Sequence, residues 1–135
     1  MKHVYYLLLA PLFMATTACA EELKPSSPVK FETLKCLGTE PFWSIDVKDN
    51  NLSMEDLNGT VKNFTLNAAI QSDNHNNRWF LKANDNKDNS PVILALTKSD
   101  QCSDDMSDFN YEYDVTALIQ GDKVLSGCCN RIAHH

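Results

Sequence analysis

The stretch FNYEYDVTALI, from Phe109 to Ile119, places an apolar side chain at every second position. Neighbouring side chains of a β-strand point to opposite faces, so this period of two predicts a strand with one buried face. The pair Gly121-Asp122 follows and predicts a hairpin turn into the run KVLSGCC, residues 123–129. The residues that we expect to share the buried face are Phe109, Tyr111, Tyr113, Val115, Ala117 and Ile119.

Short runs of the same kind precede this hairpin, and beyond the N-terminal leader no segment sustains a helical period. Clusters of Asn, Asp and Gly between the runs predict turns, among them Asp49–Asn51 and Asn58-Gly59. The strands expected here are residues 30–36, 43–47, 52–54, 64–70, 78–83 and 91–98. In the longer strand over 64–70, we expect one face to carry Phe64, Leu66, Ala68 and Ile70.

About eight short antiparallel strands at this spacing predict an all-β fold, a small barrel or a sandwich. We favour the barrel because closure removes exposed strand edges, and the interior of a barrel of about eight strands is just filled by side chains. The sandwich is the alternative.

The N-terminal residues 1–18 have the layout of a bacterial export signal: an early lysine, an apolar run from Val4 to Met14, and small residues. Two modes of processing stay open. Ala18-Cys19-Ala20 fits ordinary signal cleavage, whereas the residues that end in Cys19 are similar to a lipobox, with Thr16 where leucine is usual. We favour acylation of Cys19 because it leaves an even set of cysteines for an oxidising compartment.

Residues 19–29 are polar, with two prolines and two serines, and predict a flexible tether before a single domain at residues 30–133. Ala20 is not the aspartate associated with retention in the inner membrane. We therefore expect a periplasmic protein that is anchored to the outer membrane by its lipid alone.

The formal net charge of the chain is −6. An acidic chain without a cluster of Lys and Arg is repelled by phosphates, so we expect no nucleic-acid partner. The charge permits a basic protein partner, and we expect a monomer.

The cysteine spacing predicts a disulfide-braced domain. Cys128 and Cys129 are adjacent, so in a strand their side chains point to opposite faces and cannot serve one partner. We predict the pairs Cys102–Cys128 and Cys36–Cys129, each contributing about 2–4 kcal/mol. Four cysteines allow other pairings, including a strained bond between Cys128 and Cys129. A zinc site is the rival interpretation, but no C-x-x-C is present, and we expect no metal.

The box GTEPFW, residues 38–43, has two interpretations. Glu40 and Trp43, with Phe42 between them, would form a recognition site for a sugar or a cation if they lined a pocket. Alternatively, Pro41 fixes its own φ angle and favours an extended Glu40, so the box begins a strand and Trp43 plugs the end of the barrel. We favour the structural interpretation.

The segment SDQCSDDMSD, residues 99–108, gathers four aspartates that could bind calcium. It lacks the spacing of a calcium loop, and we expect instead a turn in which Ser107 or Asp108 caps backbone N–H groups. The possible binding residues of this region are Met106, Ser107, Asp108 and Tyr111.

The sequence gives little indication of catalysis, and we expect neither enzyme activity nor a cofactor. His75 lies in an Asn-rich turn, and the other histidines lie in the leader or at the C-terminus. With the mature cysteines assigned to disulfides, no thiolate is left as a nucleophile. The alternative is a cell-wall glycan hydrolase that uses Glu40 and Asp108 as its carboxylate pair.

The box at residues 38–43 and the segment CSDDMSDFNYEYDVTALIQGDKVLSGCC, residues 102–129, resemble an uncharacterised family of small bacterial envelope proteins and lipoproteins. Members share a G-[NT]-E-P-F-W box, a C-x-D-x-M-S-[DG] box, a Y-x-Y/V strand and a closing G-C. The resemblance implies a secreted β-rich domain, sometimes beside META-type domains, and a bond between Cys102 and Cys128. It implies no activity, and residues 48–100 do not contribute to it.

More distantly, the chain is similar in size, anchoring and disulfide-closed barrel to the membrane-bound inhibitors of c-type lysozyme, although it lacks their S-G-x-x-Y box. We expect a non-catalytic module that binds a protein or a cell-wall glycan, or that stabilises the envelope. Inhibition of a host c-type lysozyme is the alternative.

Overall fold

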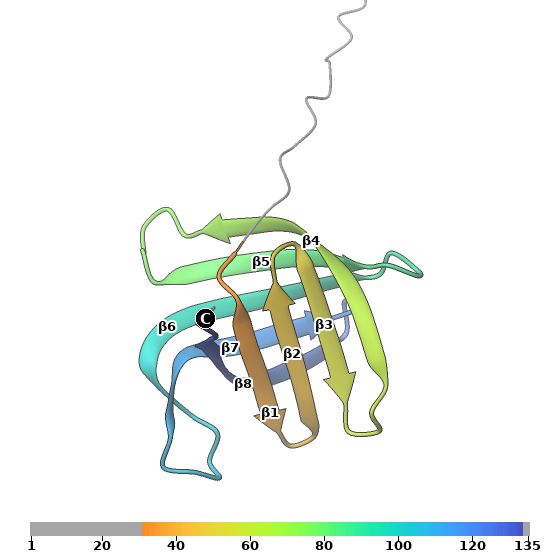
Figure 1. The fold of residues 1–135 in the computed structure, drawn as a ribbon. Coiled ribbons are helices and arrows are strands. Elements are labelled where there is room, and N and C mark those ends of the chain that lie inside the picture. The colour runs from red at the N-terminus through yellow and green to blue at the C-terminus, as the bar shows by residue number, and fades with distance from the viewer. Residues whose placement is uncertain (1–30, 134–135) are drawn as a thin grey trace, which may run out of the picture.

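A computed structural model describes residues 31–133 of the chain, and these form a closed antiparallel β-barrel. Each strand pairs with the next one along the chain, and β8 closes the barrel on β1 (Figure 1). The all-β class and the barrel architecture are confirmed; the alternative sandwich is not found. The strands are β1 (Leu34–Thr39), β2 (Phe42–Lys48), β3 (Asn51–Asp56), β4 (Val61–Gln71), β5 (Arg78–Asp85), β6 (Pro91–Ser103), β7 (Asn110–Ile119) and β8 (Lys123–Arg131).

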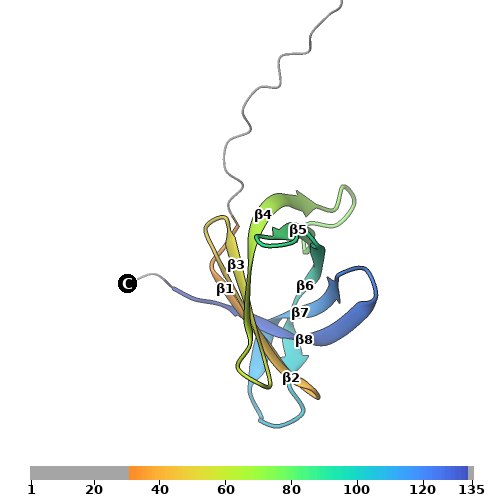
Figure 2. The same ribbon diagram turned by 90° about the vertical axis from the view of Figure 1, so that its right-hand side faces the viewer.

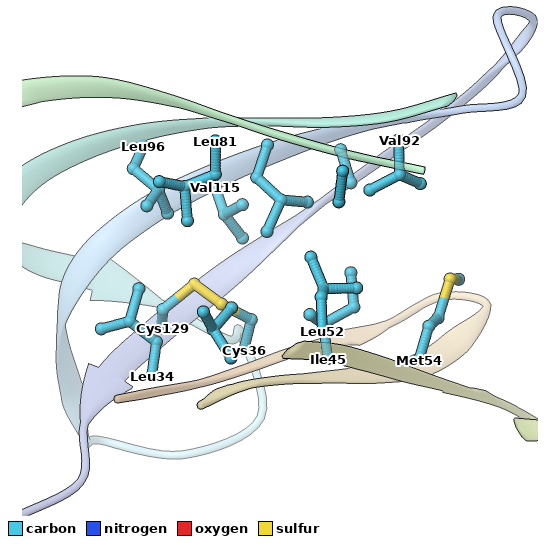
Figure 3. Close-up of a cluster of buried hydrophobic side chains, with 14 of the residues drawn as sticks. Leu34, Cys36, Ile45, Leu52, Met54, Leu81, Val92, Leu96, Val115 and Cys129 are labelled. Carbon is cyan, nitrogen blue, oxygen red and sulfur yellow. A yellow bond between two sulfur atoms is a disulfide. The ribbon is translucent and has the colours of Figure 1, made fainter. Parts of the chain in front are cut away.

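Inward-pointing side chains from every strand fill the barrel (Figure 3). Leu34, Ile45 and Leu52 come from the first three strands and face Leu81 and Val115 across the interior. All five are 2% exposed or less. The period of two therefore translates directly into a core in which apolar burial drives folding.

The predicted alternation of the strongest strand holds over most of its length. Tyr113, Val115, Ala117 and Ile119 are buried, as expected. Phe109 is a correction: it lies just before β7 and its side chain is 55% exposed. Its ring packs edge-on against Tyr111, with centroids 4.9 Å apart, and so belongs to the β6–β7 loop and not to the core.

The face expected for Phe64, Leu66, Ala68 and Ile70 is wrong in its second half. A bulge shifts the β4–β5 register between Leu66 and Ala68. One extra residue reverses every later side chain, so Ala69 turns toward the core and Ile70 points outward, 48% exposed.

Two other boundaries differ from those expected. The first strand is β1, later in the chain than the predicted 30–36. β6 runs past residue 98 to Ser103, because an irregularity between Lys98 and Cys102 lets the strand resume its pairing with β7. Cys102 lies on this extension; it is 6% exposed and is not part of the core cluster.

Both predicted disulfides are present. Cys36 bonds to Cys129 inside the barrel, across neighbouring positions of β1 and β8. Cys102 bonds to Cys128 and so ties the extension of β6 to β8. The predicted signal peptide (1–18), Cys19, the tether (19–29) and Lys30 lie outside the described residues. Within residues 31–133 there is no helix of the length and apolarity needed to cross a membrane.

Candidate binding cleft

A cleft of about 230 Å³ lies between the β1–β2 hairpin and the β6–β7 loop. These two segments lie at the same end of the barrel (Figure 1, lower part). Three segments that are far apart in sequence line the cleft. The end of β1 contributes Leu37, Gly38 and Thr39; the β6–β7 region contributes Cys102, Ser103, Asp104 and Asp105; β8 contributes Ser126, Gly127 and Cys128, with Asp114 beside them on β7. These segments are the two sequence boxes and the closing G-C on which the family resemblance was based.

Trp43 supports the cleft from within and offers no ring face to a ligand. It is 2% exposed and belongs to the hydrophobic core. A Cβ atom built on Gly38 would lie 2.1 Å from Trp43 Nε1, and one built on Gly127 would lie 2.8 Å from Trp43 Cζ2. The two glycines leave space for the indole, which favours the structural interpretation of the aromatic box.

Asp104 organises the β6–β7 loop. Its carboxylate accepts hydrogen bonds from the backbone N–H groups of Met106 (3.0 Å) and Ser107 (2.9 Å) and from the Tyr111 hydroxyl (2.9 Å). The N–H of Met106, followed by the Tyr111 hydroxyl, holds the pKa of Asp104 below its ordinary value. The same contact raises the pKa of Tyr111. We expected Ser107 or Asp108 to cap this turn; Asp104 is the main cap, and Ser107 Oγ accepts a weaker bond from the N–H of Phe109 (3.4 Å).

The hairpin and the loop are in contact. Thr39 Oγ1 donates a long hydrogen bond of 3.5 Å to the carbonyl oxygen of Asp104. The β1–β2 turn contains a cis peptide bond between Glu40 and Pro41, and Phe42 begins β2 with 48% exposure.

The structure therefore gathers most of the predicted binding residues at one end of the barrel. Glu40 and Phe42 lie on the hairpin; Met106, Ser107 and Asp108 lie exposed on the loop, and Tyr111 lies half-buried at its base. Gly38, Cys102, Asp104, Asp105 and Cys128 of the cleft lining were singled out in the sequence for other reasons, whereas Leu37, Asp114 and Ser126 were not. Asp104 had a usable signal, because an aspartate followed three positions later by serine favours a side-chain-capped turn.

The cleft is acidic. Three aspartates line it, Asp104, Asp105 and Asp114, and none of its lining residues is Lys or Arg. Asp114 Oδ2 accepts a hydrogen bond from Ser99 Oγ at 2.6 Å, which orients its carboxylate. A concave surface with charges of one sign attracts ligands of the opposite sign. The described part of the chain contains no group of three or more His, Cys, Asp or Glu side chains placed to hold a metal ion.

Comparisons with protein-family models, with curated proteins and with solved structures gave no match. The resemblance of the sequence boxes to the envelope family stays a prediction.

Proposed function

We propose that the protein is a non-catalytic binding module of the bacterial envelope, exported and anchored through Cys19, whose cleft receives a cationic side chain of a protein partner. The observation that carries this proposal is the acidic cleft between β1, β8 and the β6–β7 loop. Side chains fill the barrel interior, so the candidate site is this outer surface. The cleft takes a single long side chain better than a large ligand, since its volume is below the roughly 300–1,000 Å³ typical of small-molecule pockets.

A fluorescent tri-arginine peptide tests the cleft, with tri-glutamine as the neutral control peptide. The mature chain should bind tri-arginine at physiological salt, and fluorescence anisotropy would measure the affinity. Asp105→Asn/Asp114→Asn should weaken binding by roughly threefold to tenfold, because each partly exposed pair contributes modestly.

The matched control is Asp73→Asn/Asp122→Asn, which removes the same charge from exposed turns elsewhere on the barrel. It should change the affinity by less than about twofold at physiological salt. Equal weakening by both double variants would mean that the peptide responds to net charge alone, and would refute the cleft as the site.

A second candidate function, inhibition of a host c-type lysozyme, follows from the same acidic surface because such lysozymes are basic. The mature chain should then slow lysis of a bacterial suspension by a c-type lysozyme, and Asp105→Asn/Asp114→Asn should relieve the inhibition. Undiminished lysis at a micromolar concentration of the protein would exclude this candidate and leave the general proposal in place.

A further inference from the structure

The outer wall of the barrel carries an apolar patch on β4, β5 and β6. Ile70 and Phe80 are direct cross-strand neighbours and are 48% and 53% exposed. Phe80 lies opposite Ala95 on its other side. The bulge in β4 is what turns Ile70 outward, so this patch exists because the strand register changes at that point.

Two cations flank the patch. Arg78 and Lys82 lie two positions either side of Phe80 on β5 and share its outward face. The cross-strand rows through Phe80 and Lys82 contain no carboxylate; they comprise Ile70, Phe80, Ala95, Thr116 and Ser126 in one row and Ala68, Lys82, Ile93, Leu118 and Val124 in the other. The row through Arg78 continues through Thr97 to Asp114 on β7. Asp73 lies beside Ile70, Arg78 and Phe80 in the β4–β5 turn. In a chain with 18 Asp and Glu residues, two cations therefore stand on either side of an exposed aromatic ring.

The described chain begins beside this wall. The ring of Phe31 packs edge-on against Trp79, with centroids 6.0 Å apart, and Trp79 lies between Arg78 and Phe80. Tyr113 donates a 2.7 Å hydrogen bond to Glu32, which fixes the next residue. Figures 1 and 2 both show the chain starting near β4 and β5, at the end of the barrel away from the β1–β2 hairpin.

We infer that this wall, which we call the lipid face (Ile70, Arg78, Phe80 and Lys82), docks on an anionic phospholipid surface. The inference rests on the proposed anchor at Cys19. Residues 19–30 span at most about 40 Å, so an acylated Cys19 keeps the lipid face close to headgroups. Exposed apolar side chains flanked by Lys and Arg are the chemistry that binds such a surface.

The experiment uses the mature chain with Cys19→Ser, so that binding reflects the protein surface without a lipid. Co-sedimentation would compare vesicles of phosphatidylethanolamine and phosphatidylglycerol with vesicles of phosphatidylcholine alone. We expect binding to the anionic vesicles only. Arg78→Gln/Lys82→Gln should lower the partition coefficient by roughly 25-fold, since each cation at an anionic surface contributes about fivefold.

The charge-matched control is Lys62→Gln/Lys123→Gln, which alters exposed lysines beside Asp56 on another part of the barrel. It should leave the partition coefficient within about twofold of the parent. Ile70→Ser/Phe80→Ser separates the apolar contribution and should also weaken binding, with an unchanged thermal midpoint as the check on folding.

Three results would each overturn the proposed docking of the lipid face. They are equal affinity for both kinds of vesicle, no affinity for either kind, and equal losses of affinity in the two charge variants. Dissociation of a dimer by Ile70→Ser/Phe80→Ser, without vesicle binding by the parent, would instead assign the wall to a second copy of the chain. Intact mass of protein extracted from membranes tests Cys19 separately. If the mass shows no lipid on Cys19, the proposed anchor is refuted, whatever the result of the co-sedimentation with vesicles.

Discussion

Close packing at single residues shapes the end of the barrel. Trp43 needs the space that the missing side chains of Gly38 and Gly127 leave open. Gly127 is also tight against backbone, because a Cβ atom there would lie 2.0 Å from the carbonyl oxygen of Leu37 on the paired strand β1. Since backbone atoms cannot rotate away as a flexible side chain can, alanine at this position forces β1 and β8 apart.

Gly127→Ala should therefore lower the free energy of unfolding by about 1–3 kcal/mol, the usual cost of overpacking. Urea denaturation followed by tryptophan fluorescence would measure the change. The neighbouring Ser126→Ala is the control, because Ser126 is exposed on β8 and should tolerate the substitution. A Gly127→Ala protein as stable as its parent would show that β1 and β8 are not packed this closely.

Asp104 gives the β6–β7 loop a dependence on pH. Its pKa in the folded protein lies below its ordinary value of 3.8, chiefly through the N–H of Met106 and the hydroxyl of Tyr111. The contribution to stability is therefore complete above the unfolded value and is lost as the pH falls through the folded value. The loop should stay ordered at neutral pH and loosen only in strong acid.

Tyr111→Phe should raise the pKa of Asp104 toward its ordinary value, because one hydrogen bond to the carboxylate is lost. Carboxyl carbon shifts in an NMR titration would report this pKa directly. Phe109→Leu is the control, since it alters the ring that packs on Tyr111 but keeps the hydroxyl. An unaltered Asp104 titration in Tyr111→Phe would mean that the 2.9 Å contact does not persist in solution.

For whole strands, period-two alternation predicted the all-β class and the buried face of β7 from Tyr113 to Ile119. The Asn, Asp and Gly residues predicted the turns at Asn58-Gly59 and Gly121. The alternation failed where a strand gains a residue. Nothing in the local pattern around Leu66 and Ala68 distinguishes a regular strand from a bulged one, because register is set by pairing with β5. The outward position of Ile70, and with it the lipid face, was therefore not predictable.

For the candidate site, too, some features could be predicted from the sequence and others could not. The loop and the aromatic box could be singled out from their composition, and the adjacent cysteines limited the disulfide pairing by strand geometry. The cleft could not be predicted, because it forms only when β8 closes on β1 and brings residues 127–128 beside residues 37–39. Contacts of such sequence separation depend on the closed topology.

The two disulfides should contribute unequally to stability. Cys36–Cys129 spans a sequence separation of 93 residues and Cys102–Cys128 one of 26. In the chain-entropy description these loops correspond to about 4.6 and about 3.5 kcal/mol. In urea unfolding, Cys36→Ala/Cys129→Ala should lose more free energy of unfolding than Cys102→Ala/Cys128→Ala. The reverse order would indicate that the Cys102–Cys128 bond stabilises more of the barrel than the β6 extension.

In the whole molecule, the two ends of the barrel carry different features. Phe31 and Glu32 fix the beginning of the described chain at one end of the barrel, and the hairpin and loop that form the cleft lie at the other (Figure 1). The closed barrel between them leaves no strand edge for a partner to extend. Recognition on this fold therefore depends on outward side chains, cationic and apolar on the lipid face and acidic in the cleft.

The most direct measurement of where recognition occurs is an amide NMR map of the ¹⁵N-labelled mature chain during titration with tri-arginine. We predict that shift changes concentrate at Thr39, Asp105, Asp114 and Gly127 and disappear in Asp105→Asn/Asp114→Asn. Shift changes spread evenly over the acidic turns, with Asp73 and Asp122 moving as much as Asp105, would contradict this prediction.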